Sequence, residues 1–503
     1  MDIRRAKEEI KYTVEAYLKK DEFGHYKIPI VHQRPIFLIG PPGIGKTAIM
    51  EQIARECQIG FVSYTMTHHT RQSAIGLPFI KEETFDGQSY QVTEYTMSEI
   101  IASVHRKIEE TGKTEGILFL DEINCVSETL APTMLQFLQG KTFGNHKVPE
   151  GYIIVAAGNP PEYNRSVKEF DVVTLDRIRK LEVEQDYQVF KEYGYRQGVH
   201  DSILSYLELK KDNFYRIETT VDGKSFVTAR GWEDLSRMLY LYEEMEIPVD
   251  ETFVYQYIQH RQTASDFATY YALYQKYKDE YHIGEMLEGK EDILVSEQLQ
   301  KATFDEKLSV VSLLVSKLTE NFKEVLWCDE FVTKLHGILT KLKEMIEDGQ
   351  QENAWIMIAK EVEEEYQGKK RAGHLTKEEE KIYFAVHKFL DNYAREIASS
   401  RVTKNEEQIE VLRTFFEKET VCREEIIERA ERQLEIAFTF MEENFAESQE
   451  MVIFLTELTA NYYSMNFIRE YGSEPYYRYQ KQLLLSEQKE EVLRELRTLK
   501  FQA

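Results

Sequence analysis

The sequence of 503 residues lacks any long apolar run. No run approaches the ~20 residues that a membrane-spanning helix needs. The opening segment, MDIRRAKEEIKYTVEAYL, has the pattern of a charged amphipathic helix and no apolar signal-peptide core. Cysteine is equally scarce, and the four cysteines lie far apart without a CxxC pair, which argues against a disulfide or zinc framework. These absences predict a soluble, cytoplasmic protein with reduced thiols.

Basic residues are in short supply. Lys and Arg total 63 against 88 Asp and Glu, so the formal net charge is −25. An overall electrostatic grip on nucleic acid or on an anionic membrane needs a basic surface, and this balance disfavours both. The 42% hydrophobic and 12% aromatic content excludes a largely disordered chain. At ~150 residues per domain, the length predicts two to four domains.

Glycine and proline become rare in the second part of the chain. Only five of the 24 glycines and one of the 11 prolines lie beyond residue 290. Because both residues interrupt helices, this part is predicted to consist of long helices. Three apolar stripes at helical spacing support the prediction: Val332, Leu335, Leu339, Leu342 and Ile346; Ile427, Ala430, Leu434 and Phe438; and Leu485, Val492, Leu496 and Leu499.

The first part alternates short apolar runs with helical patterns, as a parallel sheet with crossover helices requires. Four runs predict strands clearly, and a fifth does so weakly: 35–40, 61–65, 116–120, 152–158 and 180–184. Their near-continuous apolar character indicates a sheet covered by helices on both faces. The chemistry of such a fold is expected at the carboxyl ends of its strands.

A glycine-rich loop follows the first predicted strand. GPPGIGKT has the spacing GxxxxGK[ST] between a strand and a helix, and comprises Gly40, Pro41, Pro42, Gly43, Ile44, Gly45, Lys46 and Thr47. Glycines allow backbone amides to surround phosphate oxygens at a helix N-terminus. Lys46 would neutralise the β- and γ-phosphates, and the Thr47 hydroxyl would ligate Mg²⁺. The loop therefore predicts ATP and Mg²⁺ as cofactors.

Two more predicted strands end in polar side chains. ILFLDEIN places Asp121 and Glu122 after the third strand. Asp121 would hold the Mg²⁺ through water, and Glu122 would orient and deprotonate the attacking water. Asn159 ends the fourth strand, where its amide can position the same water. A base at this position favours an ATPase over a kinase or a small GTPase.

Two arginine-bearing segments complete the candidate site. In VVTLDRIRK, Arg177 is the preferred arginine finger, which would stabilise charge on the γ-phosphate of a neighbouring subunit, and Arg179 is the alternative. TARGWEDLS places Arg230 at the start of a helix, from which its guanidinium could reach the nucleotide.

Taken in order, these motifs resemble those of the AAA+ ATPases, specifically their MoxR-type branch, over about residues 1–285. GPPGIGKT is similar to Walker A, FLDEIN to Walker B and AAGNP to the sensor-1 strand. LDRI is similar to the arginine-finger segment LDRF, and TARGWEDLS to the sensor-2 segment. The sequence departs from the family at Cys125, where arginine is common, and at Ile178, where phenylalanine is usual.

The resemblance implies three segments. Residues 1–185 would form the α/β P-loop AAA+ core, a five-stranded parallel sheet with helices on both faces. Residues 186–285 would form a small helical lid that carries sensor 2. Residues 286–503, which resemble no family, would form an all-α region that selects the partner.

The implied function is ATP hydrolysis in a homo-oligomeric ring, a hexamer, that remodels or activates a client protein in the manner of a chaperone. Partners in this branch often carry a von Willebrand factor A-type domain with a metal site. The alternative is a nucleic-acid-directed AAA+ ATPase, like a helicase or a clamp loader, which the acidic balance disfavours. An ATP-dependent switch without turnover and a nucleoside kinase are further alternatives.

Two insertions and one tyrosine-rich segment stand out from this pattern. Residues 77–95 contain Asp86-Gly87 between partly alternating runs, which predicts a β-hairpin. Residues 139–149 predict a second hairpin before the fourth strand. The tyrosine-rich segment 459–480 suits either a protein interface or packing between helices.

Overall fold

The computed structural model describes residues 1–68, 71–163, 167, 170–220, 223–290, 299–347, 354–372, 375–400, 405–446 and 448–482. The chain forms two compact units. The first comprises Met1–Val189, Thr228–Gly231 and Gln367–Leu375, and the second comprises Phe190–Val227, Trp232–Tyr366 and Thr376–Ala503. The division into three segments that the sequence suggests stays a prediction.

The first unit is built on a five-stranded parallel sheet with the strand order β2-β5-β8-β1-β9. Its strands are β1 (Ile36–Ile39), β2 (Gly60–Thr65), β5 (Gly116–Asp121), β8 (Tyr152–Gly158) and β9 (Arg179–Glu182). All five predicted strands are present, with bounds close to those expected. In the register, Ile39 pairs with Gly158 and Thr65 with Asp121, so the strands end close together at one edge.

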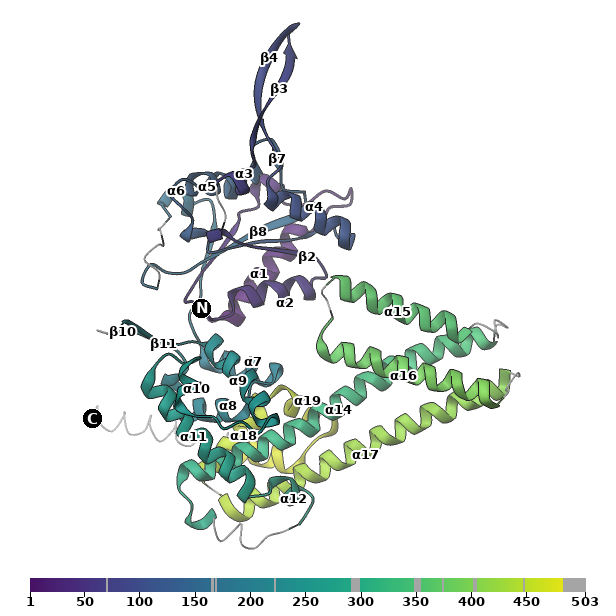
Figure 1. Cartoon of the computed structure of the whole chain (residues 1–503). Coiled ribbons are helices and arrows are strands. Elements are labelled where there is room, and N and C mark those ends of the chain that lie inside the picture. The colour runs from purple at the N-terminus through teal and green to yellow at the C-terminus, as the bar shows by residue number, and fades with distance from the viewer. Residues whose placement is uncertain are drawn as a thin grey trace, which may run out of the picture. The chain divides into compact units, whose positions relative to one another are not determined.

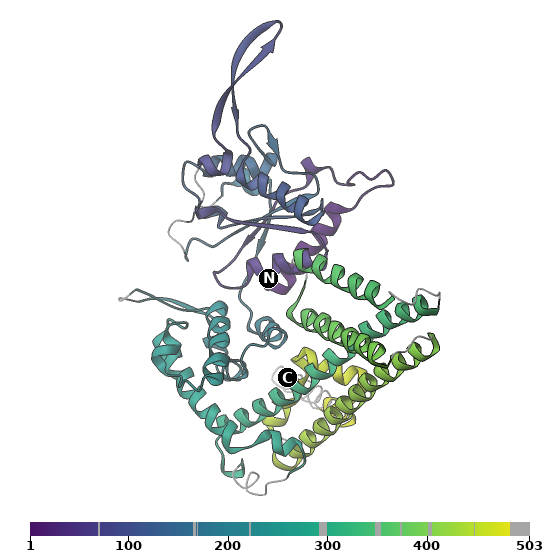
Figure 2. The ribbon, with the colours of Figure 1, turned by 45° about the vertical axis from the view of Figure 1, so that its right-hand side comes forward.

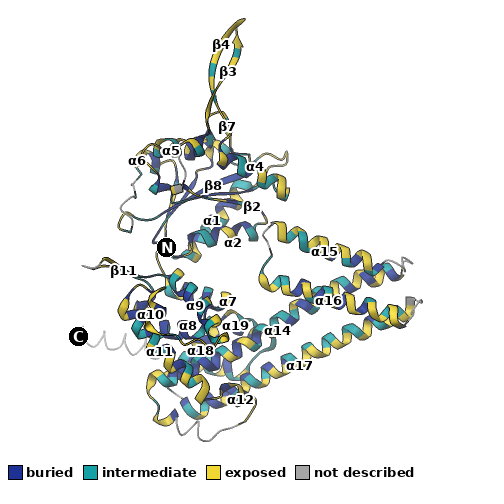
Figure 3. Cartoon of the chain, in the orientation of Figure 1, coloured by how far each residue is buried: buried dark blue, intermediate teal, exposed yellow. Residues whose placement is uncertain are grey.

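Helices cover both faces of this sheet because the strands are apolar on both sides. The helices of the first unit are α1 (Ile3–Leu18), α2 (Lys46–Glu56), α3 (Arg71–Ile75), α4 (Glu99–Thr111), α5 (Ala131–Gly140) and α6 (Val172–Leu175). α1 and α2 pack together on one face, and α3, α4 and α5 cover the other (Figure 1). The three central strands β5, β8 and β1 are almost wholly buried, as Figure 3 shows for β8, whereas the edge strands β2 and β9 are partly exposed. The predicted α/β fold is confirmed.

Two hairpins extend from the first unit. β3 (Pro78–Phe85) and β4 (Gln88–Tyr95) pair antiparallel around Asp86 and Gly87, whose φ angles of 52° and 79° are those that a two-residue hairpin turn needs. This hairpin stands away from the sheet in both views and is largely exposed (Figures 2 and 3). The second hairpin pairs β6 (Thr142–Phe143) with β7 (His146–Lys147). Both predicted hairpins are confirmed.

The second unit is mainly helical, and the all-α prediction for residues 286–503 is confirmed in the described part of that segment. Its helices are α7 (Tyr187–Gln197, beginning in the first unit), α8 (Asp201–Leu209), α9 (Ala229–Glu244, beginning in the first unit), α10 (Glu251–Tyr255), α11 (Arg261–Glu280), α12 (Ile283–Leu287), α14 (Phe304–Glu347), α15 (Ala354–Ala372, ending in the first unit), α16 (Lys377–Ser400), α17 (Asn405–Phe445), α18 (Gln449–Ala460) and α19 (Tyr462–Tyr471). The segment predicted as a helical lid also contains an antiparallel hairpin of β10 (Arg216–Thr220) and β11 (Gly223–Val227). Its alternating, β-branched sequence favours strands over a helix.

Helix α14 is the central element of the second unit and packs against α8, α11, α16, α17, α18 and α19. One apolar core joins Tyr274 of α11, Leu314 of α14 and Leu434 of α17. A buried ion pair between Lys191 and Glu457 adds a polar link from α7 to α18. The predicted lid and the helical region after it therefore share a core.

The apolar stripes are buried as expected over most of their length. Leu335, Leu339, Leu342 and Ile346 are buried, but Val332 is only half-buried because neighbouring Phe331 takes the core-facing position. The second stripe is buried, and the third lies outside the described residues. Among the described helices, none is both long and apolar enough to cross a membrane.

Candidate nucleotide-binding site

The glycine-rich loop connects β1 to α2. Gly43 and Gly45 have φ angles of 76° and 91°, in the left-handed region, and Gly45 caps α2. At Gly40, a Cβ atom would lie 2.7 Å from the carbonyl oxygen of Val183. Pro41, Pro42 and Ile44 complete the loop. The loop thus needs its glycines, and it leaves the first turn of α2 with the unpaired amides that bind anions.

Lys46, the first residue of α2, is buried beneath this loop. Its Nζ donates hydrogen bonds to the carbonyl oxygens of Gly40 and Pro41, each at 2.8 Å, and to Oδ1 of Asn159 at 2.9 Å. Burial lowers the pKa of Lys46 to about 8, against the opposing charge of Asp121. Because the direct partners of the ammonium are uncharged oxygens, an arriving phosphate would supply the missing counter-charge.

Thr47 and Asp121 meet at the edge of the sheet. The Thr47 hydroxyl donates to Oδ2 of Asp121 at 3.1 Å. Hydroxyl and carboxylate oxygens are the hard ligands that Mg²⁺ prefers, and Mg²⁺ takes water and phosphate oxygens as its other ligands. The described residues contain no group of three or more His, Cys, Asp and Glu that could hold a metal alone. The pair therefore fits a magnesium ion that arrives with a nucleotide.

Glu122 lies next to this pair in an unusual backbone conformation. Its φ of 55° is left-handed, its amide donates to Oδ1 of Asp121 at 2.9 Å, and its Oε2 accepts from the Thr67 hydroxyl at 2.9 Å. Thr67 was not expected from the sequence. Its position just after β2, which pairs with β5, is the signal that could have identified it.

Asn159 follows β8, and its backbone carbonyl is hydrogen-bonded to the side chain of Asn124. The Asn124 side chain, which is buried, donates through Nδ2 to the Asn159 carbonyl at 2.8 Å. A Cβ atom on Gly158 would lie 2.4 Å from Oδ1 of Asn124, so the two segments pack closely. Asn124 was also missed, although it stands in the same motif as Glu122.

The three arginines have different surroundings. Arg230 donates its backbone amide to the Gly43 carbonyl at 3.2 Å, and its charge helps lower the pKa of Lys46. Arg177 is exposed and donates to Gln139. Arg179 lies on β9 and forms an ion pair with Glu9 at 2.8 Å. Arg179, the alternative arginine finger, is thus already engaged in an ion pair with α1.

The structure brings five of the predicted side chains together at one edge of the sheet: Lys46, Thr47, Asp121, Glu122 and Asn159. The backbone of Arg230 adjoins the loop. Within the described residues, no hydrogen bond joins Arg177 to this group.

Residues 36–175 match the model of the ATPase family associated with various cellular activities (AAA). This segment is an AAA-family ATPase domain. The AAA domain contains the glycine-rich loop, Asp121, Glu122 and Asn159, and it ends before Arg177. AAA-family membership implies nucleotide binding and supports ATPase activity.

Two further comparisons add little beyond the AAA domain. No curated protein matches the chain. Among solved structures, the chain is similar to a protein from Cytophaga hutchinsonii described as a "putative ATPase", with 17% sequence identity, a TM-score of 0.22, and coverage of 36% of this chain and 52% of the other. The chain thus spans about half the length of that protein.

Proposed function

We propose that this chain is a MoxR-type AAA+ ATPase that hydrolyses ATP in a homo-oligomeric ring to remodel or activate a client protein. The observation that carries the hydrolytic part is the meeting of Lys46, Thr47, Asp121, Glu122 and Asn159 at one sheet edge. The order of the motifs from Walker A to sensor 2 supports the assignment to the MoxR-type branch.

Each side chain has a distinct role in this proposal. The loop amides and Lys46 bind the phosphates, and Thr47 and Asp121 hold Mg²⁺, Asp121 through water. Mg²⁺ would neutralise charge between the β- and γ-phosphates. Glu122 must leave Thr67 to accept the proton of the attacking water, which Asn159 orients.

The remaining roles concern neighbours and partners. Arg177, exposed and outside the cluster, is the proposed finger for the adjacent subunit of a hexamer. Arg230 senses the nucleotide from the start of α9. The helical region selects the client, for which a protein with a von Willebrand factor A-type domain is the first candidate. The proposed setting is the cytoplasm.

The deciding experiment is the substitution Glu122→Gln. Loss of the general base should reduce ATP turnover by about 10²–10⁴-fold and leave ATP binding unchanged, because the phosphate-binding groups stay in place. Turnover is measured by phosphate release and binding by equilibrium titration. Glu109→Gln, at an exposed position of α4, is the matched control and should behave as the wild type. Unchanged turnover in Glu122→Gln would contradict the proposed role.

The same variant can identify the client. Arrested in its ATP-bound state, Glu122→Gln should retain a partner protein that the wild type releases. Capture of nucleic acid alone, with hydrolysis that nucleic acid stimulates and salt suppresses steeply, would establish the alternative instead.

A further inference from the structure

A cavity of about 660 Å³ lies within the second unit. Six helices line it: α7, α8, α9, α11, α12 and α14. Its volume exceeds that of a single side chain several-fold and falls in the range of small-molecule sites. The question is which of its polar groups already have partners and which remain available to a ligand.

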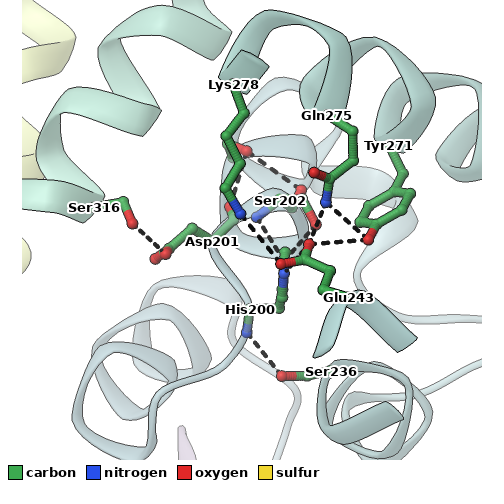
Figure 4. A network of polar contacts seen from close by, with 10 residues as sticks. His200, Asp201, Ser202, Ser236, Glu243, Tyr271, Gln275, Lys278 and Ser316 are labelled. Carbon is green, nitrogen blue, oxygen red and sulfur yellow. Dashed lines mark hydrogen bonds and ion pairs between the residues drawn. The ribbon is translucent and has the colours of Figure 1, made fainter. Parts of the chain in front are cut away.

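In one wall of the cavity, the carboxylate of Glu243 already has several hydrogen-bond and ion-pair partners. Glu243 of α9 interacts with His200 at 2.9 Å and with Lys278 at 3.2 Å (Figure 4). It also accepts hydrogen bonds from Tyr271 and Gln275. These contacts neutralise the carboxylate and leave it little capacity for a ligand.

Asp201, at the start of α8, is different. Its carboxylate accepts a hydrogen bond from the Ser316 hydroxyl (Figure 4) and, within the described chain, forms no ion pair. Burial raises its pKa, against that hydrogen bond and the positive charges of His200 and Lys323. Asp201 is therefore a carboxyl group in the cavity wall that no ion pair compensates within the described residues.

Lys323 of α14 is its counterpart. In the part of the chain that the structure describes, its ammonium has no carboxylate at ion-pair distance and instead lies 5.0 Å from the centre of the Tyr463 ring. Lys317, on the same helix and in the same wall, is neutralised by Glu320 at 2.6 Å. Asp201 and Lys323 thus face one cavity with opposite charges that do not meet.

Aromatic side chains also line this cavity. The rings of His200 and Tyr240 lie 4.7 Å apart, and Tyr274 is 3% exposed. Among the described residues, the hydroxyls of Tyr240 and Tyr274 have no hydrogen-bond partner, although both border the cavity. They offer apolar ring surface together with two uncommitted polar tips.

We propose that this cavity binds a small zwitterion, an α-amino acid, with its ammonium on Asp201, its carboxylate on Lys323 and its side chain against Tyr240 and Tyr274. An anion alone would face the uncompensated Asp201, and a cation alone would face Lys323. A zwitterion satisfies both charges at once. The inference is independent of ATP hydrolysis and is tested by binding.

The test is calorimetric titration of the full chain with L-phenylalanine and two analogues that each lack one charge, 2-phenylethylamine and 3-phenylpropionate. Only the amino acid should bind at millimolar concentration or below. Glycine, leucine, glutamate and lysine then define the side-chain preference. Asp201→Asn and Lys323→Gln should each weaken binding about tenfold or more, because each removes a charge-assisted contact.

Lys317→Gln is the matched control, since it removes a lysine of the same wall whose charge is already paired. It should leave the affinity within about twofold, and thermal unfolding verifies that each variant folds. If Asp201→Asn does not fold, the affinity of Lys323→Gln for the amino acid still tests the proposal. Equal binding of the amine or the acid, equal loss in Lys317→Gln, or no binding of any amino acid in the panel would overturn the proposal.

Discussion

At the scale of single residues, the pKa of a buried carboxyl group in this protein depends on its hydrogen-bond and ion-pair partners. Glu243 is half-buried, which by itself raises its pKa. The hydrogen bond and charge of His200 and the charge of Lys278 outweigh burial and bring the pKa to about 2, from an ordinary value of 4.5. Asp201 is next to His200 in sequence, but burial outweighs its hydrogen bond from Ser316 and the nearby positive charges, and its pKa is raised.

These contacts predict a pH-dependent contribution to stability. The folded state lowers the pKa of Glu243, so its contribution is complete above about pH 4.5 and is lost as the pH falls toward 2. Glu243→Gln should reduce the free energy of unfolding by about 1.5–3 kcal/mol at pH 7 and by less at pH 4. Urea unfolding at both pH values measures this difference. Glu244→Gln, at the exposed neighbouring position, is the control, and a difference that grows on acidification would refute the assignment.

At the scale of elements, the β3–β4 hairpin is separable from the fold that carries it. Its side chains are mostly exposed, including Phe79, Ile80 and Phe85 at 42%, 71% and 53%. Its base is closed by two hydrogen bonds between Leu77 and Thr96, each 2.9 Å long. The AAA domain therefore does not need the hairpin for its core, and the exposed apolar side chains suit contact with another molecule.

Replacement of 78–95 by a short Gly-Ser linker between Leu77 and Thr96 should test this. We expect the melting temperature and basal ATP turnover to change little, because no core side chain is removed. Capture of the client by the Glu122→Gln variant should be lost if the hairpin makes first contact. As a control, the same Gly-Ser linker replaces Gly144 and Asn145 at the tip of the second hairpin. This variant should still capture the client. A large drop in melting temperature would show that the hairpin is structural.

At the scale of the whole molecule, each active site of the proposed ring would take residues from two neighbouring chains. Under this proposal, Glu122 would act on the nucleotide of its own chain, whereas Arg177, exposed and hydrogen-bonded to Gln139, would act on that of a neighbour. Arg179 has no comparable freedom, because Glu9 and Thr13 hold its guanidinium. In the proposed ring, each site would be complete only when the neighbouring subunit supplies its Arg177.

This arrangement predicts complementation between two inactive variants. Arg177→Ala and Glu122→Gln should each lose turnover, the former by about 10³–10⁵-fold if it is a finger. When the two are mixed, some sites combine an intact Glu122 with an intact Arg177 from the adjacent subunit, and activity should return in part. Arg179→Ala should instead lower the melting temperature. Failure of the mixture to recover activity, with rings verified by light scattering, would place Arg177 outside the active site.

Much of the first unit follows from local sequence. The apolar runs predict the five strands because each is short, apolar and bounded by turn residues, and Asp86-Gly87 predicts the hairpin because both residues tolerate positive φ. Lys46, Thr47, Asp121, Glu122 and Asn159 could be placed at one edge because parallel strands align their carboxyl ends.

The tertiary structure alone decided the remaining features. Thr67 reaches Glu122, and Arg179 pairs with Glu9, only because separate segments adopt one register. The cavity between Asp201 and Lys323 likewise exists only after distant helices pack. Periodicity reports which face of an element is apolar, so the sequence determines elements and motif positions. It does not report which distant polar groups are left without a partner, because that depends on how every neighbouring side chain packs.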